Sequence, residues 1–194
     1  MSEIDLIAAA QSGDQNAFAQ LVEAHQGKVY SLSYRMTGNP DDAADLTQEA
    51  FLNAWRGLAS FHGQSSFSTW LHRLTSNVCI DFLRREKRRT ALSMTVEEDE
   101  EGRQAEVPDH RFSPEQELER RELRRTVQQG LAALSPEHRR VLVLRELEGL
   151  SYQEIAQCLE LEEGTVKSRI ARARIALKEY LQKSGNFSGF PPSK

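Results

Sequence analysis

The residues best suited to chemistry lie near the C-terminal end, as cations and small polar groups spaced for one helical face. The run Leu150-Ser-Tyr-Gln-Glu-Ile-Ala-Gln-Cys-Leu159 leads, after a short turn, into Gly164-Thr-Val-Lys-Ser-Arg-Ile-Ala-Arg-Ala-Arg174. A short helix, a tight turn and a basic helix form the helix-turn-helix pattern, whose second helix enters the major groove of DNA. The candidate DNA-contacting residues are Thr165, Lys167, Ser168, Arg169, Ala171, Arg172 and Arg174. The alternative is an amphipathic helix whose basic face is merely solvated.

Two of these residues favour base recognition over simple charge attraction. The guanidinium of Arg172 can donate two hydrogen bonds to a guanine, and the methyl of Ala171 can touch that of a thymine. Arg169 and Arg174 flank this face and can reach phosphates.

A second group of functional residues is acidic and lies in the N-terminal half. Asp41, Asp45 and Glu49 are spaced i, i+4 and i+8, and Asp42 and Gln48 lie beside them. Such a stripe repels DNA and suits a basic protein partner, although an ordinary solvated face is the simpler alternative. A carboxylate metal site is disfavoured because no histidine lies nearby at ligand spacing.

The elements that must position these residues are predicted to be helices, since no segment alternates as a strand would. Residues 92–114 carry a net charge of −5, include five consecutive acids and contain two prolines, which is typical of an extended or disordered linker. The predicted fold class is therefore all-α: two small helical domains joined by a flexible acidic linker, the second containing a helix-turn-helix. The predicted boundaries are 1–91, 92–114, 115–184 and a disordered tail at 185–194.

Composition narrows the class of protein further. The chain has 194 residues, 25 Lys+Arg against 29 Asp+Glu, and only two cysteines. Residues 61–91 nevertheless carry a net charge of +4 and residues 163–194 carry +5, which indicates two surfaces for polyanions. Without a signal peptide, a membrane span, a disulfide framework or a metal knuckle, we expect a cytoplasmic protein with no metal and no cofactor.

Three motifs in one order resemble the extracytoplasmic-function (ECF) class of bacterial sigma factors, over roughly residues 4–90 and 115–182. They are Asp41-Asp-Ala-Ala-Asp-Leu-Thr-Gln-Glu-Ala-Phe51, Phe61-His-Gly-Gln-Ser-Ser-Phe-Ser-Thr-Trp-Leu71, and Tyr152 through Arg174. The resemblance implies a factor that binds core RNA polymerase and directs promoter-specific initiation. It also implies an anti-sigma factor as a partner, which could hold the protein at the inner face of the membrane.

The resemblance assigns a role to each surface. The acidic helix, with Asp41, Asp42, Asp45, Gln48 and Glu49, would dock on core polymerase, and the C-terminal helix would read the −35 element. The −10 element would be held by Gly63, Gln64, Ser65, Ser66, Trp70, Arg73, Asn77, Arg84 and Arg85. A small polar loop can hydrogen-bond a flipped base and arginines can grip phosphates, but Trp70 also lies on an apolar stripe that favours a core position.

One departure from the family pattern and two alternatives stay open. Glu160 and Glu162 stand where many relatives have Gly in the turn and Ser or Pro before the recognition helix, and acids there could weaken phosphate contacts. An enzyme is disfavoured because the histidines are scattered and no phosphate loop or nucleophile elbow is present, so no small-molecule substrate is expected. A stand-alone repressor would explain the helix-turn-helix but would leave the acidic helix without a role.

Overall fold

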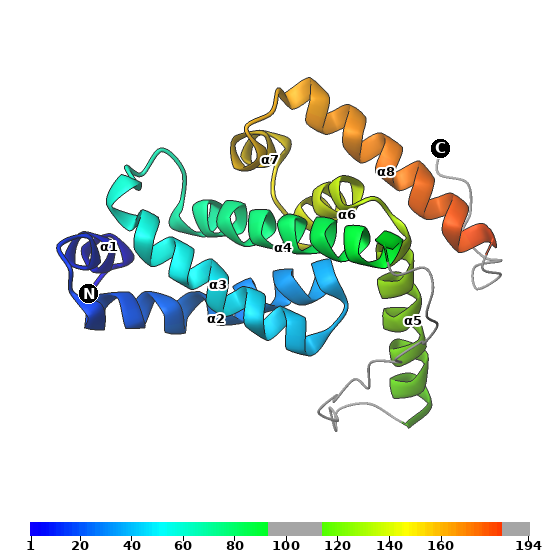
Figure 1. Ribbon diagram of the computed structural model, residues 1–194, viewed down its shortest axis with the longest axis horizontal. Helices are drawn as coiled ribbons and strands as arrows, with labels where there is room; N and C mark the ends of the chain where they lie inside the picture. The colour runs from blue at the N-terminus through cyan, green and yellow to red at the C-terminus, as the bar shows by residue number, and fades with distance from the viewer. Residues whose placement is uncertain (93–113, 184–194) are drawn as a thin grey trace.

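The computed structural model describes residues 1–92 and 114–183, and every element within these ranges is helical (Figure 1). The N-terminal half contains α1 (Glu3–Gln11), α2 (Gln15–Thr37), α3 (Pro40–Gly57), the 3-10 turn η1 (Leu58–Ser60) and α4 (Phe67–Leu92). The C-terminal half contains α5 (Pro114–Ala133), α6 (Pro136–Leu142), the π-helical turn η2 (Val143–Leu147), α7 (Tyr152–Leu159) and α8 (Glu163–Lys183). The predicted fold class, two helical domains with a helix-turn-helix in the second, is confirmed.

Some of the sequence predictions fall where the structure gives no description. The predicted acidic linker, 92–114, lies outside the described residues except at its two ends, and the predicted tail, 185–194, lies wholly outside them. The domain boundaries therefore stay predictions. Within the described ranges, no helix combines the length and apolarity that a bilayer crossing requires.

Local signals set the junction between α2 and α3. Gly38 ends α2 with a φ of +79°, a left-handed conformation that glycine adopts without steric cost. Asn39 then caps α3, because its side chain accepts hydrogen bonds from the backbone N–H groups of Asp41 and Asp42, and Pro40 occupies the first turn. This junction fixes where the acidic helix begins.

The apolar side chains form two clusters. One lies within the N-terminal half and includes Leu21, Phe51, Phe67 and Leu71, each less than a tenth exposed. The other crosses between the halves: Leu32, Met36, Val78 and Cys79 of the N-terminal half pack in the same cluster as residues of α6, α7 and α8. The C-terminal members with the least exposed surface are Val141, Val143, Leu144, Ile155, Val166, Ile170 and Ala173.

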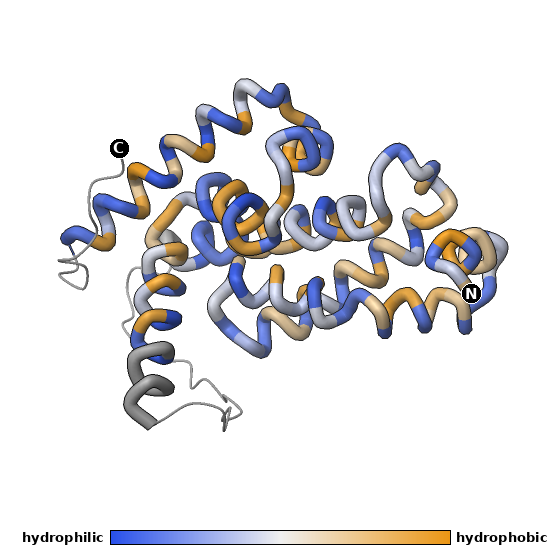
Figure 2. The backbone as a smooth tube through the Cα atoms, turned by 180° about the vertical axis from the view of Figure 1, so that it is seen from behind, coloured by the Kyte–Doolittle hydropathy of each residue, from blue (hydrophilic) through white to orange (hydrophobic). Residues whose placement is uncertain are grey.

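Helix α4 is the central element of this arrangement. It lies between α2 and α3 on one side and α6 and α7 on the other, with α8 along the outer edge of the C-terminal half (Figure 1). Apolar and polar segments alternate along α8 (Figure 2), as expected of a helix with one buried face. One face of α4 therefore serves as the meeting surface of the two halves.

Candidate nucleic-acid and docking surfaces

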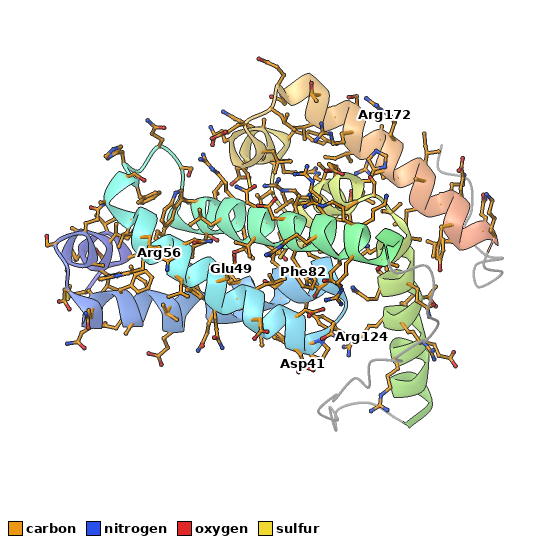
Figure 3. The ribbon with its side chains drawn as sticks, in the orientation of Figure 1. Asp41, Glu49, Arg56, Phe82, Arg124 and Arg172 are labelled. Atoms are coloured by element: carbon orange, nitrogen blue, oxygen red, sulfur yellow. The ribbon has the colours of Figure 1, made fainter. Side chains whose placement is uncertain are left out.

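The acidic residues of α3 gather on an outward face. Asp41, Asp45, Gln48 and Glu49 are exposed, whereas Ala43, Leu46 and Ala50 between them are buried. Figure 3 shows Asp41, Glu49 and Arg56 spread along this helix. The early acids also lie near the positive end of the helix dipole, which stabilises them there.

Asp42 is placed differently from the other four residues predicted for this face. It is half-buried on the flank of α3, and burial raises the pKa of its carboxyl, with a smaller contribution from the nearby Glu86 of α4. Leu52, which is 54% exposed and follows Glu49 by one turn on the same helix, was not among the residues predicted from the sequence. Leu52 lies three residues after Glu49, and this helical spacing could have placed it on the same face.

The polar loop before α4 is anchored by apolar residues at both ends. Phe61 and Phe67 are buried and their rings lie 5.7 Å apart, centroid to centroid, with Trp70 packing against both. The amide of Gln11 reaches from α1 and donates to the carbonyls of Leu58 and Phe61, at 3.0 and 2.7 Å. The loop is therefore held at its base while its tip is presented to solvent.

Individual residues of the loop have different surroundings. Gly63 and Gln64 are exposed, and Gly63 has a φ of +70° with open space around its Cα. Ser66 caps the start of α4, since its hydroxyl accepts from the N–H of Thr69 at 3.0 Å. Ser65 is half-buried and its hydroxyl donates to the carbonyl of Ser66. Trp70 is half-buried among aromatic rings, which agrees with the core interpretation of this residue.

Three further residues predicted for the −10 element lie on the face of α4 that meets the C-terminal half. Arg73 forms an ion pair with Glu160 at 2.7 Å, and Arg84 forms one with Glu137 at 2.7 Å. Asn77 accepts a hydrogen bond from Arg140 at 2.6 Å. The ion pair with Arg84 lowers the pKa of the Glu137 carboxyl. Arg85 and Arg84 both line an open groove at the end of α4, together with Glu49, Asp81, Lys87 and Arg88.

The helix-turn-helix is formed by α7 and α8. Ser151 and Glu154 form a capping box that starts α7. Glu160 ends it with a φ of +54°, the left-handed conformation that most residues avoid. Val166, Ile170 and Ala173 of α8 are fully buried and fix the rotation of that helix about its axis.

The opposite face of α8 is exposed, as predicted. Thr165, Lys167, Ser168, Ala171, Arg172 and Arg174 are all exposed, and Arg169 is half-buried. In Figure 3, Arg172 projects from the outer side of α8. Its guanidinium donates to Ser168, one turn earlier on the same helix. The polar surface is thus continuous over three turns.

Two cations on this face are paired with acids. Lys167 contacts Glu163 at 2.6 Å, and this hydrogen bond raises the pKa of the ammonium. Arg174 donates to Glu146 through two nitrogens, at 3.0 and 2.6 Å, which raises the pKa of its guanidinium. Both cations keep their charge but are partly neutralised by these carboxylates, so a polyanion would have to displace them to bind at these two positions.

No group of three or more acidic, histidine or cysteine side chains is arranged to hold a metal ion within residues 1–90 and 121–183. The two thiols are buried in the cluster shared by the two halves. Burial raises the pKa of Cys79 to about 12 and that of Cys158 to about 11, so neither is a reactive thiolate.

Comparison with known proteins identifies both halves. Residues 21–89 match sigma-70 region 2, and residues 124–177 match sigma-70 region 4. The chain is 38% identical over 173 residues to the ECF RNA polymerase sigma factor SigW of Bacillus subtilis, covering 89% of this chain and 92% of that protein. It is 39% identical to the ECF RNA polymerase sigma-E factor of Escherichia coli, covering 91% of this chain and 93% of that protein.

A longer relative and two solved structures agree with this comparison. The chain is 41% identical to the sigma factor SigE of Mycolicibacterium smegmatis, covering 89% of this chain but spanning 65% of that protein's length. Sigma factor RpoE, solved with the anti-sigma factor NepR from Bartonella quintana, matches with a TM-score of 0.65 and 26% identity, covering 85% of this chain and 96% of that one. CnrH, solved with the cytosolic domain of CnrY, matches with a TM-score of 0.63 and 32% identity, covering 92% of this chain and 96% of that one.

Proposed function

The chain belongs to the ECF class of RNA polymerase sigma factors, and from this premise we propose how its surfaces divide the work of promoter recognition. As a sigma factor it directs promoter-specific transcription initiation with RNA polymerase. In our proposal it acts in the cytoplasm by reversible association, with no catalytic step, no cofactor and no small-molecule substrate.

We assign core polymerase docking to the exposed face of α3. Asp41, Asp45, Gln48 and Glu49 present a negative surface to a basic partner, and Leu52 adds an exposed apolar contact one turn beyond Glu49. Asp42 contributes from the flank, where its half-buried carboxyl helps set the local charge. A surface of this kind gives a fast, salt-dependent association.

We assign the −10 element to the loop at 63–66 and to α4. Gly63, Gln64, Ser65 and Ser66 form a small polar loop whose base is held by aromatic packing, so that its tip can accept an extruded base. Along α4, phosphate contacts would come from Arg73, Arg84 and Arg85, with Asn77 reaching a base edge and Trp70 supporting the loop.

We assign the −35 element to α8. The observation that carries this assignment is that Lys167, Ser168, Ala171 and Arg172 lie together on the exposed face, opposite three fully buried residues. Arg172 would read a base, while Thr165, Arg169 and Arg174 would hold phosphates. Because RpoE and CnrH were solved with NepR and CnrY, we also propose that an anti-sigma factor regulates this chain.

The decisive experiment is run-off transcription with sigma-free core polymerase on fragmented genomic DNA, followed by sequencing of the transcript 5′ ends. We expect discrete start sites that share two upstream elements and that vanish when the protein is omitted. Tight binding of duplex DNA by the protein alone, without transcripts, would instead support a stand-alone repressor.

Two variants separate the assigned roles. Arg172→Ala should reduce discrimination at one −35 base pair by about 1–3 kcal/mol while leaving core binding unchanged; Lys178→Ala, an exposed cation farther along α8, is its control. Asp45→Lys combined with Glu49→Lys should weaken core binding and leave the fold intact, as judged by circular dichroism. Equal loss of promoter and core binding by Arg172→Ala would refute the division of roles.

A further inference from the structure

Tyr152 is the first residue of α7, and its ring contacts a residue on the exposed face of α8. The side chain is half-buried and packs against the apolar cluster shared by the two halves. The ammonium nitrogen of Lys167 lies over the ring, 5.6 Å from its centroid. A cation within about 6 Å of an aromatic face is attracted by the ring's quadrupole. Tyr152 is therefore placed to act on a residue of the proposed −35 surface.

Contacts outside α8 fix the position of this ring. The guanidinium carbon of Arg145, in the π-helical turn, also lies over the ring, 4.6 Å from its centroid. Arg145 is itself held, because it donates to the carbonyl of Leu150 at 2.8 Å, and Leu150 is buried. The capping box of Ser151 and Glu154 fixes the backbone on either side of Tyr152. The tyrosine is thus the fixed member of its contact with Lys167.

Lys167 keeps the capacity to bind DNA while it contacts the ring. An ammonium has three N–H donors. The carboxylate of Glu163 accepts one of them at 2.6 Å, the ring of Tyr152 lies on another side, and the side chain of Lys167 is still 55% exposed. A lysine side chain is long and flexible, so ordering it on binding costs entropy. Contacts that order it beforehand reduce that cost.

We propose that Tyr152 is a positioning residue for promoter recognition, whose ring, held by Arg145, orders the ammonium of Lys167 to read one base of the −35 element. The inference rests on the proposed −35 role of α8 and adds a residue of α7 to it. The base edge that suits an ammonium in the major groove is rich in acceptors, such as N7 and O6 of guanine. In this role the tyrosine acts through Lys167, and its hydroxyl makes no contact with DNA.

The test measures base preference at each −35 position with the complete holoenzyme. Core polymerase carrying the chain transcribes a promoter found by run-off sequencing, in which the −35 base pairs have been randomised, and the transcript yield of each template is counted. Lys167→Met identifies the position that Lys167 reads. Tyr152→Leu keeps an apolar side chain against the cluster but removes the ring, and should lower the preference at that position by about two- to fivefold, the ratio expected of a surface cation–π contact. Tyr152→Phe, which keeps the ring, should retain the full preference.

A double-mutant cycle separates positioning from a structural role. In the Lys167→Met background, Tyr152→Leu should change no base preference further. A uniform loss at every position, or an equal loss with and without Lys167, would overturn the positioning role and leave the proposed function standing. An equal loss in Tyr152→Phe and Tyr152→Leu would also overturn it, because the hydroxyl would then carry the effect. Absence of any −35 preference in the unmodified chain would contradict the assignment of α8 and the inference with it.

Nuclear magnetic resonance of the free chain tests the contact without DNA and without relying on a variant that folds. The chain is made with ¹³C-labelled lysine, and the ε-methylene signal of Lys167 is assigned by its disappearance in Lys167→Arg. We expect this signal upfield of the other lysine signals, because an aromatic ring shields nuclei above its face. Tyr152→Leu should abolish the shift and Tyr152→Phe should keep it. A signal at the ordinary lysine position in the unmodified chain would overturn the proposal.

Discussion

Arg139 is expected to be the most sensitive polar residue of the interface. It lies on α6, is 6% exposed, and its guanidinium donates to three backbone carbonyls. Leu131 and Ala132, at the end of α5, accept at 2.7 Å each, and Met36, at the end of α2, is the third acceptor. One side chain therefore caps the carbonyl ends of two helices from opposite halves of the chain.

The expected cost of removing this side chain follows from those three contacts. Carbonyls at a helix C-terminus lack partners within the helix, and they attract a cation because of the helix dipole. Hydrogen bonds to a charged donor contribute about 1.5–3 kcal/mol each, and they are not fully additive. Arg139→Met keeps the volume but removes all three donors, so we expect the free energy of unfolding to fall by about 3–5 kcal/mol.

Urea unfolding followed by circular dichroism at 222 nm measures this change. Arg172→Met is the control, because it makes the same substitution at an exposed arginine whose contacts are local, and it should change stability by less than about 0.5 kcal/mol. The loss of stability in Arg139→Lys should lie between the losses in Arg139→Met and Arg172→Met, since an ammonium keeps the charge but not the planar array of donors. A loss below about 1 kcal/mol in Arg139→Met would refute the capping argument.

Three further predictions concern titration, thiols and the left-handed turn. Burial first, then the nearby Lys28, lower the pKa of His72 to about 4, whereas the unfolded value is about 6.5. Folding therefore favours the neutral imidazole of His72. The free energy of unfolding keeps this contribution in full above about pH 6.5 and should fall by about 2 kcal/mol between pH 7 and pH 5, where the unfolded chain binds a proton that the folded chain does not. His72→Gln should remove that part of the pH dependence; an unchanged slope would count against it. Cys79 and Cys158 should resist iodoacetamide at pH 8 until urea unfolds the chain, as mass spectrometry would report, and labelling at the rate of a free thiol would contradict their burial. Glu160→Gly should be about 1 kcal/mol more stable than Glu160→Ala in urea unfolding, because both lose the ion pair but only glycine avoids the strained φ; equal stability would disprove the strain.

The helices and the exposed face of α8 could be predicted from the sequence because their signals are local. Val166, Ile170 and Ala173 recur at helical spacing, and burying them determines which residues of α8 face outward. The start of α3 was likewise predictable, since Asn39 and Pro40 act only on the turn that follows. Such features depend on residues within one or two turns of each other.

The contacts between the halves could not be predicted, because they join residues far apart in the sequence. No sequence pattern distinguishes Arg139 and Arg140 from ordinary solvated cations, yet burial lowers the pKa of both guanidiniums. The short π-helical turn at 143–147 also carries no local signal, and it places Glu148 beside Arg35. A buried charge is recognisable only when its partner is known, and the partners from the other half of the chain lie on α2 and α4.

Glu160 belongs to a local turn and also contacts the other half of the chain. From the sequence, an acid in the turn was expected to weaken the phosphate contacts of α8. In the fold, its carboxylate points to Arg73 of α4 at 2.7 Å, so its negative charge is neutralised by a residue proposed for the other promoter element. Replacing it should therefore affect DNA binding by α4 more than binding by α8. The left-handed backbone at this position directs a carboxylate to Arg73, which glycine, the residue best suited to that conformation, would lack.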